Sequence, residues 1–246
     1  ADVRVEKGVN YLPAGRAELA DLYFPKDMPP GKRFPAVVII HGGGFTGGKR
    51  DAAREVNIGT TLARNGYVCM SVYYALATPD RGTWPLALHD CKTAVRWLRA
   101  NADRLNVDPD NIGTIGGSAG GHLAAMLALT GPDAGLDPKE PHGDVSCRVR
   151  CAVPMYGPAT FVGRGKLALI GKPEADAADE YKRASPVTHA TKDDPPVLIL
   201  HGTADTTVPV EQSEILAKAL KDAGVVHELV IVPGAPHSFH LQPKER

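Results

Sequence analysis

The sequence predicts an α/β fold in which helices cover both faces of one mostly parallel β-sheet, and two observations predict it. From about residue 35 onward, runs of valine, isoleucine and leucine alternate with helical stretches, the pattern of parallel strands joined by crossover helices. The chain has 246 residues, 43% of them hydrophobic, which is enough to bury one sizeable core without disulfide or metal cross-links. We therefore expect residues 1–246 to form a single domain.

The first two strands are expected to form an antiparallel hairpin that leads into the sheet. Residues 3–12 and 16–25 have strand character, and Pro13, Ala14 and Gly15 between them predict the turn. Six further runs rich in valine, isoleucine and leucine follow, in the order FPAVVIIHGG, YVCMSVYYA, NIGTIGGSAG, CRVRCAVPMYG, PVLILHGTAD and HELVIVPGAPH. The sequence therefore predicts eight strands.

Helical stretches fit between these strands, and three of them stop just before a glycine, a residue that commonly ends a helix. They span residues 51–65, 86–102, 119–130 and 211–223. The segment 159–195, between the sixth and seventh strands, is less periodic and predicts one helix near residues 174–184. We expect a small insertion or lid in this segment.

The charge and hydropathy of the chain indicate which kinds of molecule it is expected to bind. The chain carries 28 basic and 28 acidic residues, so its formal net charge is zero. This balance provides no field that would recruit nucleic acid or an anionic membrane, and it fits a small neutral substrate. No apolar run reaches the roughly 18 residues that a membrane-spanning helix needs. The chain begins at Ala1, which fits either a removed signal peptide, and hence secretion or a periplasmic location, or a trimmed chain.

The cysteines do not indicate a metal site. Cys69 and Cys91 lie in apolar stretches, where a buried, reduced thiol is the usual state. Cys147 and Cys151 would lie about 13 Å apart on an extended strand, too far for a disulfide unless the segment bends. Without further cysteine or histidine at ligand spacing, this pair is also a poor zinc site. We expect neither a metal nor an organic cofactor.

The strongest local motif is Gly-Gly-Ser-Ala-Gly at 116–120, which lies between a β-branched run and a helical stretch. A serine on a tight strand-to-helix turn adopts a sparsely allowed backbone conformation, so small flanking residues are needed and its hydroxyl projects above the sheet edge. Ser118 is therefore the predicted nucleophile. Taken alone, the pentapeptide also fits a chance occurrence in a glycine-rich chain.

A second motif, His-Gly-Gly-Gly-Phe at 41–45, follows the apolar run Ala-Val-Val-Ile-Ile. Consecutive glycines let backbone amides approach a ligand and turn towards it, which is how an oxyanion receives hydrogen bonds. A phosphate-binding loop is a competing interpretation, but the Gly-Lys-Ser/Thr ending of such loops is missing. A purely structural glycine-rich turn stays open for this motif by itself.

Two later strand ends, HGTADTTVP and PGAPHSF, complete the candidate site. Because the carboxyl ends of parallel strands lie along one edge of a sheet, Ser118, Asp205 and His237 are expected to meet there. Their order in the chain, serine then aspartate then histidine, is that of α/β-hydrolases. His237 is the expected base, although His240 is close enough to compete. His201 is interpreted as a structural residue of the turn.

With these motifs, the chain resembles α/β-hydrolases of the bacterial esterase group around hormone-sensitive-lipase-like, acetyl-xylan esterase-like and feruloyl esterase-like enzymes. The resemblance covers residues 16–240 and rests on HGGG, GGSAGGHL, WPLALHD, HGTAD and PHSF. It implies a catalytic triad of Ser118, Asp205 and His237.

The resemblance also implies an oxyanion hole formed by the backbone amides of Gly43, Gly44 and Ala119. In GGSAGGHL, His122 stands where asparagine is the alternative, and this histidine resembles the carbohydrate-esterase side of the group more than the lipase side.

The chain departs from this group in three places. Only 40 residues precede HGGG, too few for a large N-terminal helical cap, so we expect an open site. Ala75 stands where relatives often have arginine, so Asp90 loses its expected partner and is interpreted as structural, with the partner left open. Only nine residues follow His237, whereas the fold usually closes with another helix. Either the chain is truncated or a homo-oligomer contact replaces that helix.

These residues predict a serine carboxylesterase that acts through an acyl-enzyme. Phe45, Tyr74, Trp84 and Tyr156 lie near strand ends, where they either line the substrate pocket or belong to ordinary packing. With 6% aromatic residues and no cap, the sequence favours short-acyl esters, such as acetyl groups on sugars or small aryl esters, and the resemblance adds feruloyl esters of carbohydrates. The expected partner is a small-molecule or carbohydrate ester.

Two alternatives remain at this level. An arylformamidase-like or other small-molecule serine hydrolase would share the triad and differ in its pocket. A non-catalytic ligand-binding protein with the same fold is the second alternative, but such proteins commonly lose the serine or the histidine, and both are present here.

Overall fold

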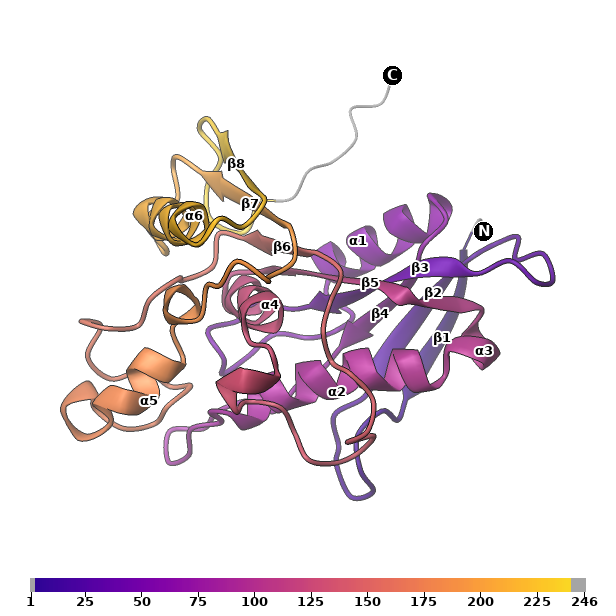
Figure 1. Cartoon of the computed structure of the whole chain (residues 1–246), viewed down its shortest axis with the longest axis horizontal. Helices are drawn as coiled ribbons and strands as arrows, with labels where there is room; N and C mark the ends of the chain where they lie inside the picture. The colour runs from indigo at the N-terminus through magenta and orange to yellow at the C-terminus, as the bar shows by residue number, and fades with distance from the viewer. Residues whose placement is uncertain (1–2, 240–246) are drawn as a thin grey trace.

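The computed structural model describes residues 3–239, and within that range eight strands form one continuous sheet (Figure 1). In chain order they are β1 (Val3–Val9), β2 (Ala20–Pro25), β3 (Phe34–Ile40), β4 (Val68–Val72), β5 (Val107–Gly117), β6 (Ala152–Met155), β7 (Val197–Gly202) and β8 (His227–Val232). Their order across the sheet is β1-β2-β4-β3-β5-β6-β7-β8. The pairs β1–β2 and β2–β4 are antiparallel and the remaining pairs are parallel, which confirms the predicted sheet.

Helices lie on both faces of this sheet, as expected. α1 (Ala53–Arg64) packs on one face, and α2 (Leu86–Ala100) and α4 (Ala119–Leu129) pack on the other (Figure 1). α6 (Glu211–Ala223) packs against β7 and β8. The described residues also form α3 (Ala102–Leu105), α5 (Ala178–Arg183) and 3₁₀ turns at Pro132–Ala134, Glu174–Asp176 and Pro186–Thr188.

Burial on both faces explains why the central strands are almost continuously hydrophobic. In β3, Val38 and Ile40 face the main core, whereas Ile39 points to the opposite face, where it packs with Tyr23 and Ala63. Every residue of α4 is buried, and this helix follows directly from β5. Ser118 therefore lies between the buried end of β5 and a fully buried helix.

The predicted turn between the first two strands is wrong in its length. Strand pairing ends at Val9 and resumes at Ala20, so ten residues rather than three connect the strands. The connection folds back onto the rest of the chain, where the Tyr11 hydroxyl donates to the Tyr73 carbonyl at 2.8 Å. Contacts with distant residues, which the local pattern does not contain, therefore take these residues out of the hairpin.

The segment between β6 and β7 contains α5 and two of the 3₁₀ turns, close to the predicted helix at 174–184. Its backbone is fixed by buried side chains: the Tyr181 hydroxyl accepts from the Leu167 amide at 2.8 Å and donates to the Lys172 carbonyl at 2.9 Å. The Gln212 side chain of α6 accepts from the Ala159 amide at 2.9 Å. The segment is thus tied both to itself and to α6.

Within residues 3–239, no helix is both long and apolar enough to cross a membrane. The same residues contain no cluster of three or more histidine, cysteine or acidic side chains placed to hold a metal ion. All four cysteines are free thiols, with Cys151 exposed and the other three buried.

Candidate active site

Ser118 lies on the turn between β5 and α4, with a strained backbone at φ 58° and ψ −121°. Such a conformation persists only where the surroundings hold it. The Ser118 amide donates to the Met155 carbonyl at 2.9 Å, which anchors the turn to β6. A Cβ atom on Gly120 would lie 2.1 Å from the Ile40 carbonyl oxygen, so the helix can pass this close to β3 only with glycine there. The motif is therefore required by packing, and it projects the serine side chain from the sheet edge.

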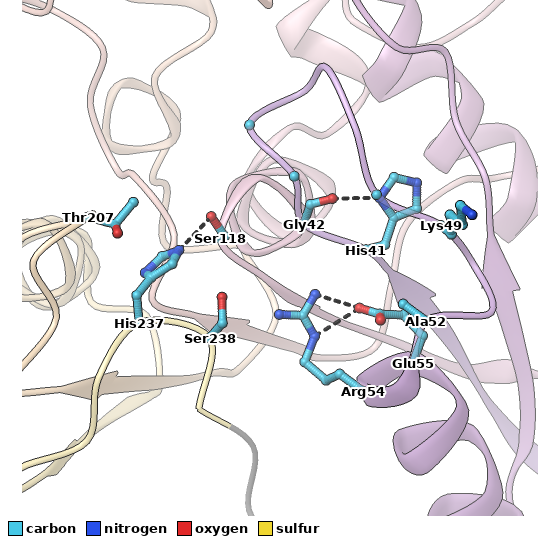
Figure 2. A pocket seen from close by; sticks show the side chains of 13 residues that line it. His41, Gly42, Lys49, Ala52, Arg54, Glu55, Ser118, Thr207, His237 and Ser238 are labelled. Carbon is cyan, nitrogen blue, oxygen red and sulfur yellow. Dashed lines mark hydrogen bonds and ion pairs between the residues drawn. The ribbon is translucent and has the colours of Figure 1, made fainter.

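His237 lies between Ser118 and Asp205 and is within hydrogen-bonding distance of both. Its Nε2 is 3.0 Å from the Ser118 Oγ, and its Nδ1 is 2.6 Å from Asp205 Oδ2. Asp205 follows β7 and His237 follows β8, so three separate strand ends supply this chain of hydrogen bonds. Figure 2 shows the histidine ring directed at the serine hydroxyl. The structure thus brings together the three residues that the sequence singles out.

The surroundings of Asp205 keep its carboxylate ionised and oriented. Its side chain is 1% exposed, and Oδ1 accepts from the amides of Thr207 and Val208, both at 2.9 Å. Burial alone would raise the pKa of Asp205, but the hydrogen bonds from His237 and from these two amides outweigh it, so the pKa lies below its usual 3.8. A negative charge at this point favours the Nδ1–H tautomer of His237 and leaves Nε2 free to accept a proton.

Two other histidines, His201 and His240, lie close in the chain to Asp205 and His237. His201 is buried, with Nδ1 2.6 Å from Ser213 Oγ and Nε2 2.9 Å from the Val208 carbonyl oxygen. It therefore supports the loop that carries Asp205, as the structural interpretation expects. His240, the competing base, lies outside the described residues.

The glycine loop after β3 approaches Ser118 with amides that are free to bind a ligand. Gly43 has φ 116° and Gly44 has φ 60°, and both line the same cavity as Ser118. Within residues 3–239, neither of their amides donates a hydrogen bond. The amide of Ala119 lacks an acceptor inside its helix, because Ala119 is the first residue of α4. Unpaired amides beside the serine are the donors that an oxyanion would require.

His41, the first residue of the glycine motif, is a neutral support for this loop. It is 1% exposed, its Nδ1–H donates to the Gly42 carbonyl at 2.7 Å, and its ring stacks on Tyr74 with centroids 4.4 Å apart. Burial lowers the pKa of His41 to about 4. The Tyr74 hydroxyl in turn donates to the His41 carbonyl at 3.0 Å, so both the ring and the backbone of His41 are held in place.

A cavity of about 390 Å³ opens over these groups (Figure 2). Ser118 and His237 lie on one side, the loop 42–44 forms a second wall, and the first turn of α1 forms a third. None of the residues lining this cavity comes from the segment 159–195.

Arg54 of α1 is a cavity residue that the sequence did not single out. Its Nε and Nη2 donate to Glu55 Oε1 at 2.8 and 2.5 Å, and its Nη1 donates to the Tyr156 hydroxyl at 2.9 Å. The Tyr156 ring packs edge-on against His237, with centroids 5.1 Å apart. Nothing in the local sequence marks Arg54, because an arginine in the first turn of an amphipathic helix is ordinarily a solvated residue.

The four aromatic candidates occupy different places, and none of them is among the residues lining the Ser118 cavity. Tyr156 lies behind His237, and Tyr74 is fully buried under His41. Phe45 packs edge-on against His122 and Phe161. Trp84 lines a separate cavity near α5, which shares no lining residue with the first.

Asp90 finds its partner in the connection between β1 and β2. Arg16 Nη2 lies 2.6 Å from Asp90 Oδ2, and the Ala75 amide donates to the same oxygen at 2.8 Å. Arg16 therefore fills the role of the arginine that the sequence lacks after β4, from a position that no local pattern indicates.

The comparisons with known proteins show which family the chain belongs to. The BD-FAE family model matches residues 20–220. Esterase LipQ from Mycobacterium tuberculosis is 34% identical over 245 residues, an alignment that covers 95% of this chain and 57% of LipQ. The chain thus spans somewhat more than half the length of the first curated relatives that it matches.

Solved structures of esterases share the fold. A truncated form of a carbohydrate esterase from gut microbiota matches with a TM-score of 0.82 at 28% identity, covering 95% of this chain and 89% of that one. Esterase 2 from Thermogutta terrifontis, solved with butyrate bound, matches with a TM-score of 0.80 at 32% identity, covering 97% and 85%. The chain therefore belongs to the BD-FAE family and has the α/β-hydrolase fold of serine esterases.

Proposed function

We propose that the protein hydrolyses carboxylic esters, with Ser118 as nucleophile, His237 as general base and Asp205 as the residue that orients the base. The observation that carries this proposal is the continuous hydrogen-bonded series from Asp205 through His237 to Ser118, with steps of 2.6 and 3.0 Å, at the edge of an open cavity. The order of these three residues in the chain and the family to which the chain belongs support the same assignment.

In the first half of the reaction, the Ser118 Oγ attacks the ester carbonyl carbon while His237 Nε2 takes the hydroxyl proton. The negative charge that develops on the carbonyl oxygen is placed against the amides of Gly43, Gly44 and Ala119. The bond to the alcohol oxygen then breaks, and that oxygen leaves with the proton from His237. The products of this half are the free alcohol and an acyl group on Ser118.

In the second half, His237 takes a proton from a water molecule whose oxygen attacks the acyl carbon. The bond to the Ser118 Oγ breaks, the serine recovers its proton from His237, and the carboxylic acid leaves. Asp205 stays ionised throughout and stabilises the imidazolium that forms in each half, which its lowered pKa favours.

We further propose esters of short acyl groups, such as acetyl, as the substrates, with feruloyl esters of carbohydrates as a second class. A cavity of about 390 Å³ is a modest space for an ester together with its alcohol. The Thermogutta terrifontis esterase was solved with butyrate, a short acid, and the gut-microbiota relative is a carbohydrate esterase. The first of these supports a short acyl group, and the second supports a carbohydrate ester.

Steady-state kinetics on a panel of esters tests this proposal. The panel consists of 4-nitrophenyl acetate, butyrate and octanoate, together with two carbohydrate esters, acetylated xylan and a feruloylated sugar. We expect the acetate and butyrate to be cleaved with the highest kcat/KM, and we expect Ser118→Ala to lower kcat by at least about a thousandfold. Ser146→Ala is the matched control, because Ser146 is exposed and does not line the cavity.

Two results would contradict the proposal. Full activity of the Ser118→Ala variant would remove the nucleophile from the mechanism. A clear preference for octanoate would exclude the short-acyl assignment but leave the triad in place.

A further inference from the structure

The wall of the cavity opposite His237 carries an excess of positive charge. Lys49 and Arg54 both line the cavity, and Glu55 is the one acidic residue among the described residues that do so. Within residues 3–239, no ion pair neutralises Lys49, whose side chain is exposed. The chain as a whole has no net charge, so this local excess is a property of the site.

Arg54 has hydrogen-bond donors to spare after its contacts with protein groups. A guanidinium has five N–H donors, and Glu55 takes the side formed by Nε and Nη2, while Tyr156 takes one donor of Nη1. This leaves one N–H on each terminal nitrogen without an acceptor among residues 3–239. Two donors on adjacent nitrogens of one guanidinium suit the two oxygens of a carboxylate.

The guanidinium lies next to the reacting centre. A Cβ atom built on Gly42 would lie 3.2 Å from the Ser118 Cβ and 3.4 Å from Arg54 Nη2, so one methyl group would touch both side chains. Figure 2 shows Arg54 on the same side of the loop as Ser118 and His237. Its side chain is only 14% exposed, so solvent screens its charge weakly.

The position of Tyr156 indicates which part of the ester would meet this charge. Tyr156 contacts the His237 ring on one side and hydrogen-bonds Arg54 through its hydroxyl. His237 must deliver a proton to the departing oxygen, so the alcohol part of an ester lies on the His237 side of Ser118. Arg54 therefore faces the alcohol part rather than the acyl part.

The start of α1 adds to this preference for negative charge. No side chain caps the helix at Ala52, which lines the same cavity. The amides of the first turn therefore keep a partial positive charge on this wall. Together with the spare donors of Arg54 and the charge of Lys49, this gives the cavity wall formed by α1 and the preceding loop three sources of positive potential against one acidic side chain, Glu55.

We propose that Arg54 and Lys49 bind a carboxylate on the alcohol part of the substrate, so that the protein prefers esters of acidic alcohols or phenols to their neutral counterparts. This inference rests on the proposed esterase function and specifies the substrate class of the same cavity. Because the carboxylate contacts persist from the bound ester to the transition state, the preference is expressed mainly in KM.

The test compares two esters that differ in charge and hardly in shape, namely 3-acetoxybenzoate and 3-acetoxybenzamide. We expect kcat/KM for the anionic ester to exceed that for the amide by about tenfold or more, since a hydrogen-bonded charge contributes at least that factor. Lys49→Met and Arg54→Met are each expected to reduce this ratio several-fold, and added salt is expected to reduce it in the wild type. The ratio cancels any loss that affects both esters equally.

Further variants keep the result interpretable. Arg54→Met leaves the buried Glu55 carboxylate without its partner, so Arg54→Met with Glu55→Gln is made beside it. Lys49→Met alters an exposed residue and tests the proposal even where the Arg54 variants fail to fold. Lys221→Met, which removes a charge from the exposed face of α6, is the matched control and is expected to leave the ratio unchanged.

The outcomes separate this inference from the proposed function. Hydrolysis of both esters at equal kcat/KM, or a ratio that Lys49→Met and the Arg54 variants leave unchanged, overturns the carboxylate site while the esterase function stands. Failure to hydrolyse either ester, together with failure on 4-nitrophenyl acetate, overturns the esterase function itself.

Discussion

Arg16 and Asp90 lie 74 residues apart in the chain and form a two-point ion pair, with Nη2–Oδ2 at 2.6 Å and Nη1–Oδ1 at 3.1 Å. The Asp90 side chain is 2% exposed and belongs to α2, while Arg16 belongs to the connection between β1 and β2. Asp90 also accepts from the amide of Ala75, just beyond β4. One carboxylate thus connects three separate segments of the chain.

This pair is expected to stabilise the fold strongly. Arg16→Met leaves a buried carboxylate unpaired, so we expect the free energy of unfolding in urea to fall by about 3 kcal/mol. Arg33→Met is the matched control, because Arg33 pairs with Asp103 on the surface, where both side chains are well exposed and the loss should stay below about 1 kcal/mol. Equal losses in the two variants would show that Asp90 does not depend on Arg16.

The glycine loop at residues 42–44 offers a comparison between neighbouring glycines. A Cβ atom on Gly43 would lie 2.3 Å from the Gly47 carbonyl oxygen, and the backbone there has φ 116°, so Gly43→Ala must displace the loop. We expect kcat on 4-nitrophenyl acetate to fall by roughly a hundredfold, the effect of losing one oxyanion donor.

Gly44→Ala is the control for that variant. A Cβ atom on Gly44 meets nothing within 4 Å, and its φ of 60° is accessible to alanine at a cost of about 1 kcal/mol. The loss of kcat should therefore be clearly smaller than for Gly43→Ala. Similar losses would mean that the loop does not hold the amides in the way described.

Acid is expected to destabilise the fold through its buried histidines. His122 is fully buried and donates from Nε2 to the Ala184 carbonyl at 2.7 Å, and burial lowers its pKa from 6.5 to about 4. The unfolded chain binds a proton below pH 6.5, whereas the folded protein does so only near pH 4. The stabilisation from neutral His122 is therefore complete above pH 6.5 and is lost as the pH falls towards 4.

His122→Gln removes this titration, and urea unfolding at two pH values measures the effect. At about pH 7.5 we expect the variant to have a lower free energy of unfolding than the wild type. This difference should be smaller by about 2 kcal/mol at about pH 5, where the wild type has lost most of the histidine contribution. A cost independent of pH would contradict the low pKa of His122.

The parts of the site that the sequence predicts are those that local backbone geometry dictates. Ser118 needs a strained turn between two glycines, and Asp205 and His237 sit at strand ends, so each leaves a mark within a few residues. Arg16 has a partner that is far away in the chain, and Arg54 matters because of its position in a cavity. Neither of these contacts constrains the residue types next to the arginine in the sequence, so no local motif marks them. Trp84 looked equivalent to Tyr156 in the sequence, because both follow strands, yet only Tyr156 contacts His237.

The role of Ser118 is tested most directly by trapping it. The protein is incubated with diethyl 4-nitrophenyl phosphate, which transfers a phosphoryl group to an activated serine, and the modified residue is located by peptide mass spectrometry. We expect one diethylphosphoryl group on Ser118, release of one equivalent of nitrophenolate and complete loss of esterase activity, with no labelling of Ser118→Ala or of His237→Asn. Loss of activity with the label on another residue, or labelling that persists in Ser118→Ala, would show that Ser118 is not the nucleophile.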